Sequence, residues 1–133
     1  MNTINDLPEK LKTQLYNFQK LGVDFGISRK GRILLADEMG VGKTVQAIAI
    51  ASLYRDDWPV LILCPCSVKY IWRDELMYWL DSIKLSDIQI LRNGKQTLDS
   101  YAKFYIFSYD LAMRMEDKII NKRFRFGIAD EAH

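Results

Sequence analysis

Short continuous apolar runs alternate along the chain with longer stretches in which apolar residues recur at every third or fourth position. A short apolar run indicates a strand that is buried on both faces, whereas the longer spacing is typical of a helix that covers a sheet. The pattern predicts strands at residues 32–36, 60–64, 88–91, 104–107 and 126–129, and helices at residues 8–26, 44–54, 67–80 and 110–120.

The alternation of strands with helices predicts an α/β fold of three layers, in which a mostly parallel central sheet is covered by helices on both faces. Residues 60–64 are apolar throughout and are expected in the middle of this sheet. The helix at 44–54 is apolar nearly all round, so we expect it to be buried.

The predicted helix at 67–80 has one apolar face. Ser67 is a plausible N-cap for it. Lys69 is expected to point away from the apolar face, and Trp72 and Trp79 are expected to pack in the core rather than stack on bases. The apolar face is predicted to consist of Val68, Ile71, Trp72, Leu76, Trp79 and Leu80.

The composition fits a folded domain, because the 133 residues are 49% hydrophobic. Nineteen Lys and Arg against 17 Asp and Glu leave a net charge of +2, which neither demands nor excludes a polyanionic partner. Cys64 and Cys66 have no second cysteine pair for zinc, and we expect them to be small core residues in a reducing compartment. No apolar run approaches the roughly 20 residues of a membrane span, and the first residues lack the features of a signal peptide. We therefore expect an intracellular protein without a membrane partner.

The segment between the first predicted strand and the helix at 44–54 has the most specific chemical pattern in the chain. Its glycines allow backbone N–H groups to approach a phosphate, and the start of a helix adds its positive dipole end. Lys43 can reach the β- and γ-phosphates, and the Thr44 hydroxyl can hold a magnesium ion. The general P-loop pattern has a further glycine where this chain has Asp37. The residues predicted to bind nucleotide here are Asp37, Glu38, Met39, Gly40, Val41, Gly42, Lys43 and Thr44.

A second pattern, Asp-Glu-Ala-His, follows the last predicted strand at residues 130–133. A carboxylate at Asp130 is what a P-loop ATPase uses to hold magnesium together with Thr44. Glu131 can accept a proton from the attacking water. Because the two motifs occur in order and after strands of the right kind, they predict ATP hydrolysis, with Lys43 and Glu131 as catalytic residues and with ATP and Mg²⁺ bound.

The two motifs together resemble those of the Swi/Snf-related DNA-dependent ATPases of helicase superfamily two. That family also replaces the usual glycine at the position of Asp37, and the resemblance covers nearly the whole chain. It implies that Gln19 reads the adenine edge, where an amide can pair with N6 and N7. Residues 57–63, with Trp72 and Trp79 downstream, look nearest the annealing-helicase branch, which remodels stalled forks.

The resemblance also implies a fold and a partner. Residues 1–133 would be the helicase ATP-binding, first RecA-like lobe, truncated at the Asp-Glu-Ala-His box, and the second lobe with its arginine fingers would be absent. Duplex or forked DNA would be bound independently of sequence through its backbone, at the segments that hold Ser67, Lys69 and Tyr109. In a eukaryote the protein would act in the nucleus, in DNA repair or chromatin remodelling.

A lobe that ends at the acidic box has two expected consequences. The chain alone should bind nucleotide but show negligible DNA-stimulated hydrolysis, because arginine fingers are worth roughly a thousandfold or more in rate. In RecA-like lobes the strand after the box lies between the P-loop strand and the box strand, so a vacancy is expected there. The isolated chain should then be marginally stable, or a neighbouring chain should fill the gap.

Two interpretations from other classes compete with this one. One is a non-motor P-loop enzyme such as a small GTPase or a nucleotide kinase. A GTPase is disfavoured, because residues 121–124, Asn-Lys-Arg-Phe, lack the final Asp of the base-reading motif. A non-catalytic ATP-dependent DNA-binding or assembly module, which keeps the ATP site for structure, stays open as the alternative.

Overall fold

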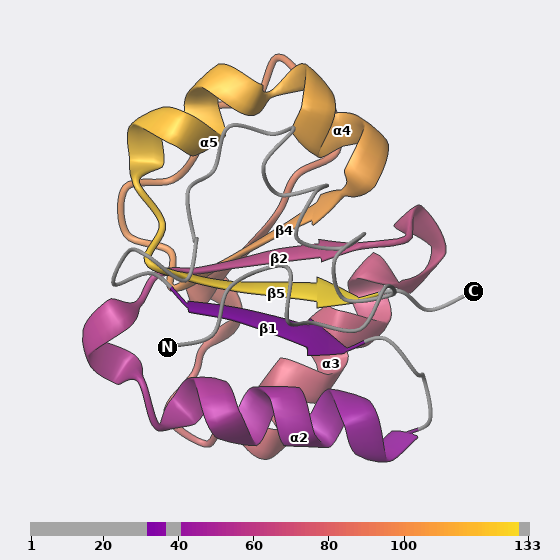
Figure 1. Cartoon of the computed structure of the whole chain (residues 1–133), viewed down its shortest axis with the longest axis vertical. Coiled ribbons are helices and arrows are strands. Elements are labelled where there is room, and N and C mark those ends of the chain that lie inside the picture. The colour runs from indigo at the N-terminus through magenta and orange to yellow at the C-terminus, as the bar shows by residue number, and fades with distance from the viewer. Residues whose placement is uncertain (1–31, 37–40, 131–133) are drawn as a thin grey trace, which may run out of the picture.

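Five strands form a single sheet in the computed structural model, which describes residues 32–36 and 41–130 (Figure 1). The strands are β1 (Arg32–Ala36), β2 (Val60–Cys64), β3 (Ile88–Ile90), β4 (Phe104–Ser108) and β5 (Phe126–Asp130). Their order across the sheet is β1-β5-β2-β4-β3, and every neighbouring pair is parallel. The helices are α2 (Val41–Ser52), α3 (Lys69–Trp79), α4 (Tyr109–Arg114) and α5 (Glu116–Lys122), and short 3₁₀ turns lie at η2 (Arg55–Asp57), η3 (Cys66–Val68) and η4 (Leu85–Asp87).

Helices cover both faces of the sheet. In Figure 1, α2 and α3 lie on one face and α4 and α5 lie on the other. Side chains alternate across a strand, so β2 contributes Val60 and Ile62 to the core under α2 and α3, and Leu61 and Leu63 to the core under α4 and α5. The predicted three-layer α/β fold is therefore confirmed, and residues 60–64 form an inner strand that is buried throughout.

The strand that leads into the P-loop pairs directly with the strand that leads into the acidic box. Arg32 on β1 lies opposite Phe126 on β5, and Ala36 lies opposite Asp130. On its other side β5 pairs with β2. The predicted vacancy between these two strands is therefore wrong. Unpaired backbone groups on two facing strand edges are costly, and direct pairing satisfies them, so the sheet gives no reason to expect a gap-filling partner.

Helix α3 begins with a tighter turn than the sequence predicted. The 3₁₀ turn η3 precedes it, and α3 itself starts at Lys69. Val68 occupies the N-cap position and no side chain caps the helix, so the prediction of Ser67 as the N-cap is wrong. A 3₁₀ turn has about 3.0 residues, where an α-helical turn has about 3.6.

The face that α3 buries differs in part from the predicted one. Trp72 and Leu76 are buried, as predicted. Lys69 is buried as well, against the prediction, whereas Ile71 and Trp79 are 56% and 47% exposed. Core packing is therefore confirmed for Trp72 and wrong for Trp79, whose indole instead bonds Glu75 on the same helix at 3.1 Å.

Two other helical predictions also need correction. Helix α2 is not buried all round, because Ile50 near its end and Leu53 just beyond it are exposed. The single helix predicted at 110–120 is instead two helices, α4 and α5, which are separated at the buried residue Met115. No helix in the described part of the chain is long and apolar enough to cross a membrane.

Candidate functional site

The carboxyl ends of β1 and β5 lie side by side, and each leads into one of the two chemical motifs. Ala36 ends β1 opposite Asp130, which ends β5. The chain continues from Ala36 to the start of α2 at Val41, and residues 37–40 between them lie outside the described residues. The register of the sheet thus brings the P-loop segment and the acidic box to one edge, the edge at which ligands bind in α/β sheets.

Asp130 is buried and is held by segments from both faces of the sheet. The residue is 1% exposed, and its Oδ2 accepts a 2.6 Å hydrogen bond from Nε1 of Trp72 on α3. Its backbone carbonyl oxygen accepts a 3.0 Å bond from the hydroxyl of Tyr109, the first residue of α4. The end of β5 is therefore fixed both at its side chain and at its backbone.

Thr44 lies near the start of α2 and is nearly fully buried. Its hydroxyl and the carboxylate of Asp130 are hard oxygen donors of the kind that Mg²⁺ prefers, so the donors present fit this ion. Among residues 32–36 and 41–130, His, Cys, Asp and Glu form no group of three or more that could hold a metal ion. The backbone of Gly42 and Lys43 belongs to the first turn of α2, where the positive end of the helix dipole lies.

A buried thiol lies at the end of the neighbouring strand β2. Burial, and after it the negative charge of Asp130, raises the pKa of the Cys64 thiol from its ordinary 9.0 to about 12. The thiol is therefore protonated and unreactive at neutral pH. Cys66 is also free but is exposed, so the prediction of a small core residue is confirmed for Cys64 and wrong for Cys66.

The three residues predicted to contact DNA lie in different surroundings. Ser67 is exposed in η3. Lys69 is buried, and its Nζ donates a 3.0 Å hydrogen bond to the carbonyl oxygen of Leu91. Tyr109 is partly buried against the backbone of Asp130. Of the three, Ser67 alone presents an exposed side chain at the carboxyl edge of the sheet.

A basic and aromatic cluster lies at this same edge of the sheet. Arg92, which follows the carboxyl end of β3, donates from Nε to the Tyr70 hydroxyl at 3.0 Å. The guanidinium carbons of Arg73 and Arg92 lie 5.0 and 5.8 Å from the centroid of the Tyr70 ring. Arg73 also pairs with its neighbour Asp74 at 2.9 Å. Since guanidinium groups suit phosphate oxygens, Tyr70, Arg73 and Arg92 form a candidate contact for a nucleic-acid backbone.

Sequence reasoning missed this cluster and the partner of Trp72. Tyr70 and Arg92 stand 22 positions apart, and they meet because α3 packs across β4 to β3. A buried indole N–H needs an acceptor, which is a signal that the sequence does contain. The acceptor, however, lies 58 positions further along the chain, and no local pattern identifies it.

Several predicted site residues lie outside the part of the chain that the structure describes. Their roles in adenine binding, phosphate binding and proton transfer therefore stay predictions. They are Gln19, Asp37, Glu38, Met39, Gly40 and Glu131.

Comparison with known proteins gives matches over almost the whole chain. The family model of the SNF2-related domain matches residues 18–133. The SWI/SNF-related matrix-associated actin-dependent regulator of chromatin subfamily A-like protein 1 of Xenopus tropicalis is 42% identical over 130 residues, which cover 98% of this chain and 14% of that protein. The DNA annealing helicase and endonuclease ZRANB3 of Homo sapiens is 36% identical over 137 residues, which cover 99% of this chain and 13% of that protein. The chain thus spans about one seventh of the length of these curated relatives.

Proposed function

Because the chain belongs to the SNF2-related domain family, we propose that it is the first RecA-like, ATP-binding lobe of an ATP-dependent DNA translocase of the annealing-helicase kind. Such a protein would remodel duplex DNA or stalled forks. The observation that carries the proposal is that the parallel strands β1 and β5 end in register, with Ala36 opposite Asp130, so that the P-loop segment and the acidic box leave the sheet at the same carboxyl edge. An acidic strand end in this place is how P-loop ATPases hold Mg²⁺ on nucleotide phosphates.

The proposed roles of the residues follow from their chemistry. Lys43 places its ammonium on the β- and γ-phosphates, while the start of α2 directs its backbone N–H groups at them. Thr44 and Asp130 supply oxygen ligands to Mg²⁺, which when bound neutralises charge on the phosphate oxygens. Glu131 accepts the proton of the attacking water, and Gln19 pairs with the adenine edge.

We place the DNA-binding surface at the same edge of the sheet, over Ser67, Tyr70, Arg73 and Arg92. Two guanidinium groups and an exposed hydroxyl before α3 suit phosphate oxygens, and such contacts bind DNA independently of its sequence. Lys69 is left out of this surface, because its ammonium is buried on the carbonyl of Leu91. Tyr109 is assigned to the support of Asp130.

The names of the relatives support the proposed setting. One is named as a regulator of chromatin and the other as a DNA annealing helicase, which favours action on nuclear DNA in repair or chromatin remodelling. Hydrolysis is proposed to need a second lobe with arginine fingers, which are worth roughly a thousandfold or more in rate. The chain alone would then bind ATP without appreciable DNA-stimulated turnover.

The test is ATP hydrolysis with and without forked DNA by a two-lobed protein that carries this chain as its first lobe. Lys43→Ala and Glu131→Gln are compared with the wild type. DNA-stimulated turnover that both substitutions abolish supports the motor. A wild type that binds ATP but shows no turnover on any DNA overturns it in favour of the non-catalytic module.

A further inference from the structure

We propose that Trp72 is a positioning residue for the carboxylate of Asp130, and that it sets the orientation in which this carboxylate binds Mg²⁺. The role rests on the proposed function. Trp72 and Asp130 stand 58 positions apart, yet the indole Nε1 and the carboxylate Oδ2 meet at 2.6 Å in a buried setting. That distance is slightly shorter than the roughly 2.7–3.2 Å of most N–H···O bonds.

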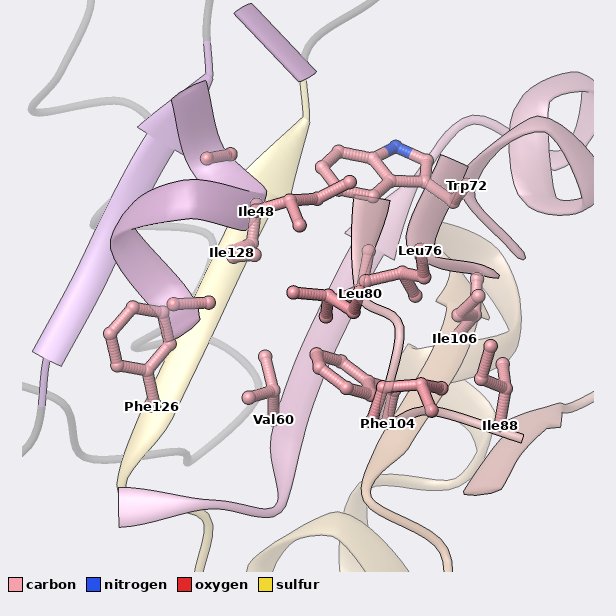
Figure 2. Packing of buried hydrophobic residues seen from close by; sticks show 14 of the residues in the cluster. Ile48, Val60, Trp72, Leu76, Leu80, Ile88, Phe104, Ile106, Phe126 and Ile128 are labelled. Atoms are coloured by element: carbon pink, nitrogen blue, oxygen red, sulfur yellow. The ribbon is translucent and has the colours of Figure 1, made fainter. Parts of the chain in front are cut away.

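The packing of Trp72 fixes the direction of its N–H. The residue is 1% exposed and belongs to the same buried cluster as Ile48, Leu76 and Ile128. Figure 2 shows the indole at one end of this cluster, with its nitrogen on the side away from most of the apolar side chains. An indole has one hydrogen-bond donor, its N–H, and no acceptor. The N–H suits a carboxylate oxygen, and the ring has no other polar group that could take its place.

A donor of this kind selects one orientation of the carboxylate. The terminal torsion of an aspartate has a broad energy profile, so a fixed donor at one oxygen favours one orientation of the carboxylate. The hydroxyl of Tyr109 holds the backbone of Asp130, and the indole of Trp72 holds its side chain. The donor from Trp72 is also neutral, so it orients the carboxylate without adding a positive charge that would compete with a cation.

A merely structural role for the bond predicts a different behaviour. If the bond only satisfies a buried N–H, its loss lowers folding stability but leaves the effect of Mg²⁺ on nucleotide affinity unchanged. If Trp72 positions the carboxylate, loss of the bond lowers the gain in nucleotide affinity that Mg²⁺ provides. The affinity for nucleotide without metal then stays unchanged.

The substitution that separates the two is Trp72→Phe, which removes the N–H and keeps an aromatic ring. Its matched control is Trp79→Phe, because the exposed Trp79 indole bonds Glu75 on the same helix. The affinity of the 133-residue chain for ATP is measured with Mg²⁺ and with EDTA. We expect the gain in affinity from Mg²⁺ to fall about tenfold or more in Trp72→Phe, the usual effect of losing a partner that holds a metal ligand. Affinity in EDTA, and both affinities of the control, should not change.

The outcomes for the two proposals are distinguishable. A wild type that fails to bind ATP, or binds it without any gain from Mg²⁺, overturns the proposed function and this role with it. If Mg²⁺ raises the ATP affinity of Trp72→Phe as much as that of the wild type, the role of Trp72 is overturned and the proposed function is not. Should Trp72→Phe fail to fold, the indole N–H resonance of Trp72 in the wild type is followed by NMR. It should shift with Mg²⁺-ATP and not with ATP in EDTA, and an indole resonance that does not respond to Mg²⁺ overturns the role.

Discussion

The Nζ atom of Lys69 lies 3.0 Å from the carbonyl oxygen of Leu91, and both residues are buried. This bond joins the first residue of α3 to the segment that follows β3. The N–H of Leu91 is bonded in turn to the carbonyl of Ile106 on β4 at 3.0 Å. The ammonium of Lys69 therefore satisfies a backbone acceptor at the edge of the sheet, which is a structural role.

Replacement of Lys69 by methionine should destabilise the fold. Lys69→Met keeps the apolar stem but leaves the carbonyl of Leu91 buried without the donor, which costs about 1–3 kcal/mol. Urea denaturation measures the loss, with Lys95→Met as a control at an exposed position that should change stability by less than about 0.5 kcal/mol. Equal stabilities of the two variants would contradict the structural role.

The buried thiol of Cys64 should make stability fall at alkaline pH. Its pKa is raised from 9.0 to about 12 in the folded protein, so above pH 9 the unfolded chain loses this proton while the folded chain keeps it. This contribution is fully present below pH 9 and declines as the pH rises towards 12. The difference in unfolding free energy between wild type and Cys64→Ala should shrink by about 1.4 kcal/mol from pH 8 to pH 10.

Two controls accompany this comparison. Cys66→Ala removes an exposed thiol and should keep the pH dependence of the wild type. Alkylation at pH 8 should label Cys66 in the folded chain and spare Cys64, because the reactive form is the thiolate. A Cys64→Ala difference that is the same at both pH values would argue against a buried, protonated thiol.

The pairing of β1 with β5 can be tested by hydrogen exchange. A parallel strand with a neighbour on each side has successive N–H groups bonded alternately to the two neighbours. The amides of Gly127, Ile128 and Ala129 should therefore all exchange far more slowly than that of Gly94 in its exposed turn. An alternating pattern, with every second amide of β5 exchanging fast, would show that one edge of β5 is open.

The proposed DNA surface predicts that positive charge matters at the carboxyl ends of the strands and not at their amino ends. Arg92→Ala should weaken DNA binding by a similar factor for all sequences and reduce the slope of log affinity against log salt by about one. Arg125→Ala removes the same charge at the amino end of β5, where Arg125 lies 3.9 Å from Asp57, and should change neither quantity. Fluorescence anisotropy over a salt series measures both, and equal effects of the two variants would refute the placement.

The sheet could be predicted from the sequence because each inner strand is a continuous apolar run. The prediction at 60–64 matches β2 in both bounds, and β4 and β5 extend the predicted runs by one residue each, Ser108 and Asp130. Both added residues are polar, so an apolar pattern ends before them. Both side chains are buried, and each has a hydrogen-bond partner there: Ser108 caps α4, and Asp130 accepts from Trp72.

What the sequence did not predict depends on contacts between distant segments. The neighbour of β5 is decided by backbone pairing that leaves no trace in local apolar spacing, so the vacancy beside β1 was predicted wrongly. Lys69 is buried because its ammonium finds an acceptor on Leu91, 22 positions further along the chain, and the exposure of Trp79 at the end of α3 has no signal in the apolar spacing. The sequence patterns at residues 37–44 and 130–133 are local, so they could be recognised without the fold, and the roles assigned to them stay predictions.

The most direct test of the account is calorimetric titration of the 133-residue chain with Mg²⁺-ATP, beside Lys43→Ala. The wild type should bind, and Lys43→Ala should lose about tenfold or more in affinity, because a P-loop lysine carries the charge that meets the β- and γ-phosphates. Lys84→Ala, at an exposed position before η4, should bind like the wild type. A folded wild type that does not bind, or a Lys43→Ala variant with wild-type affinity, would contradict it.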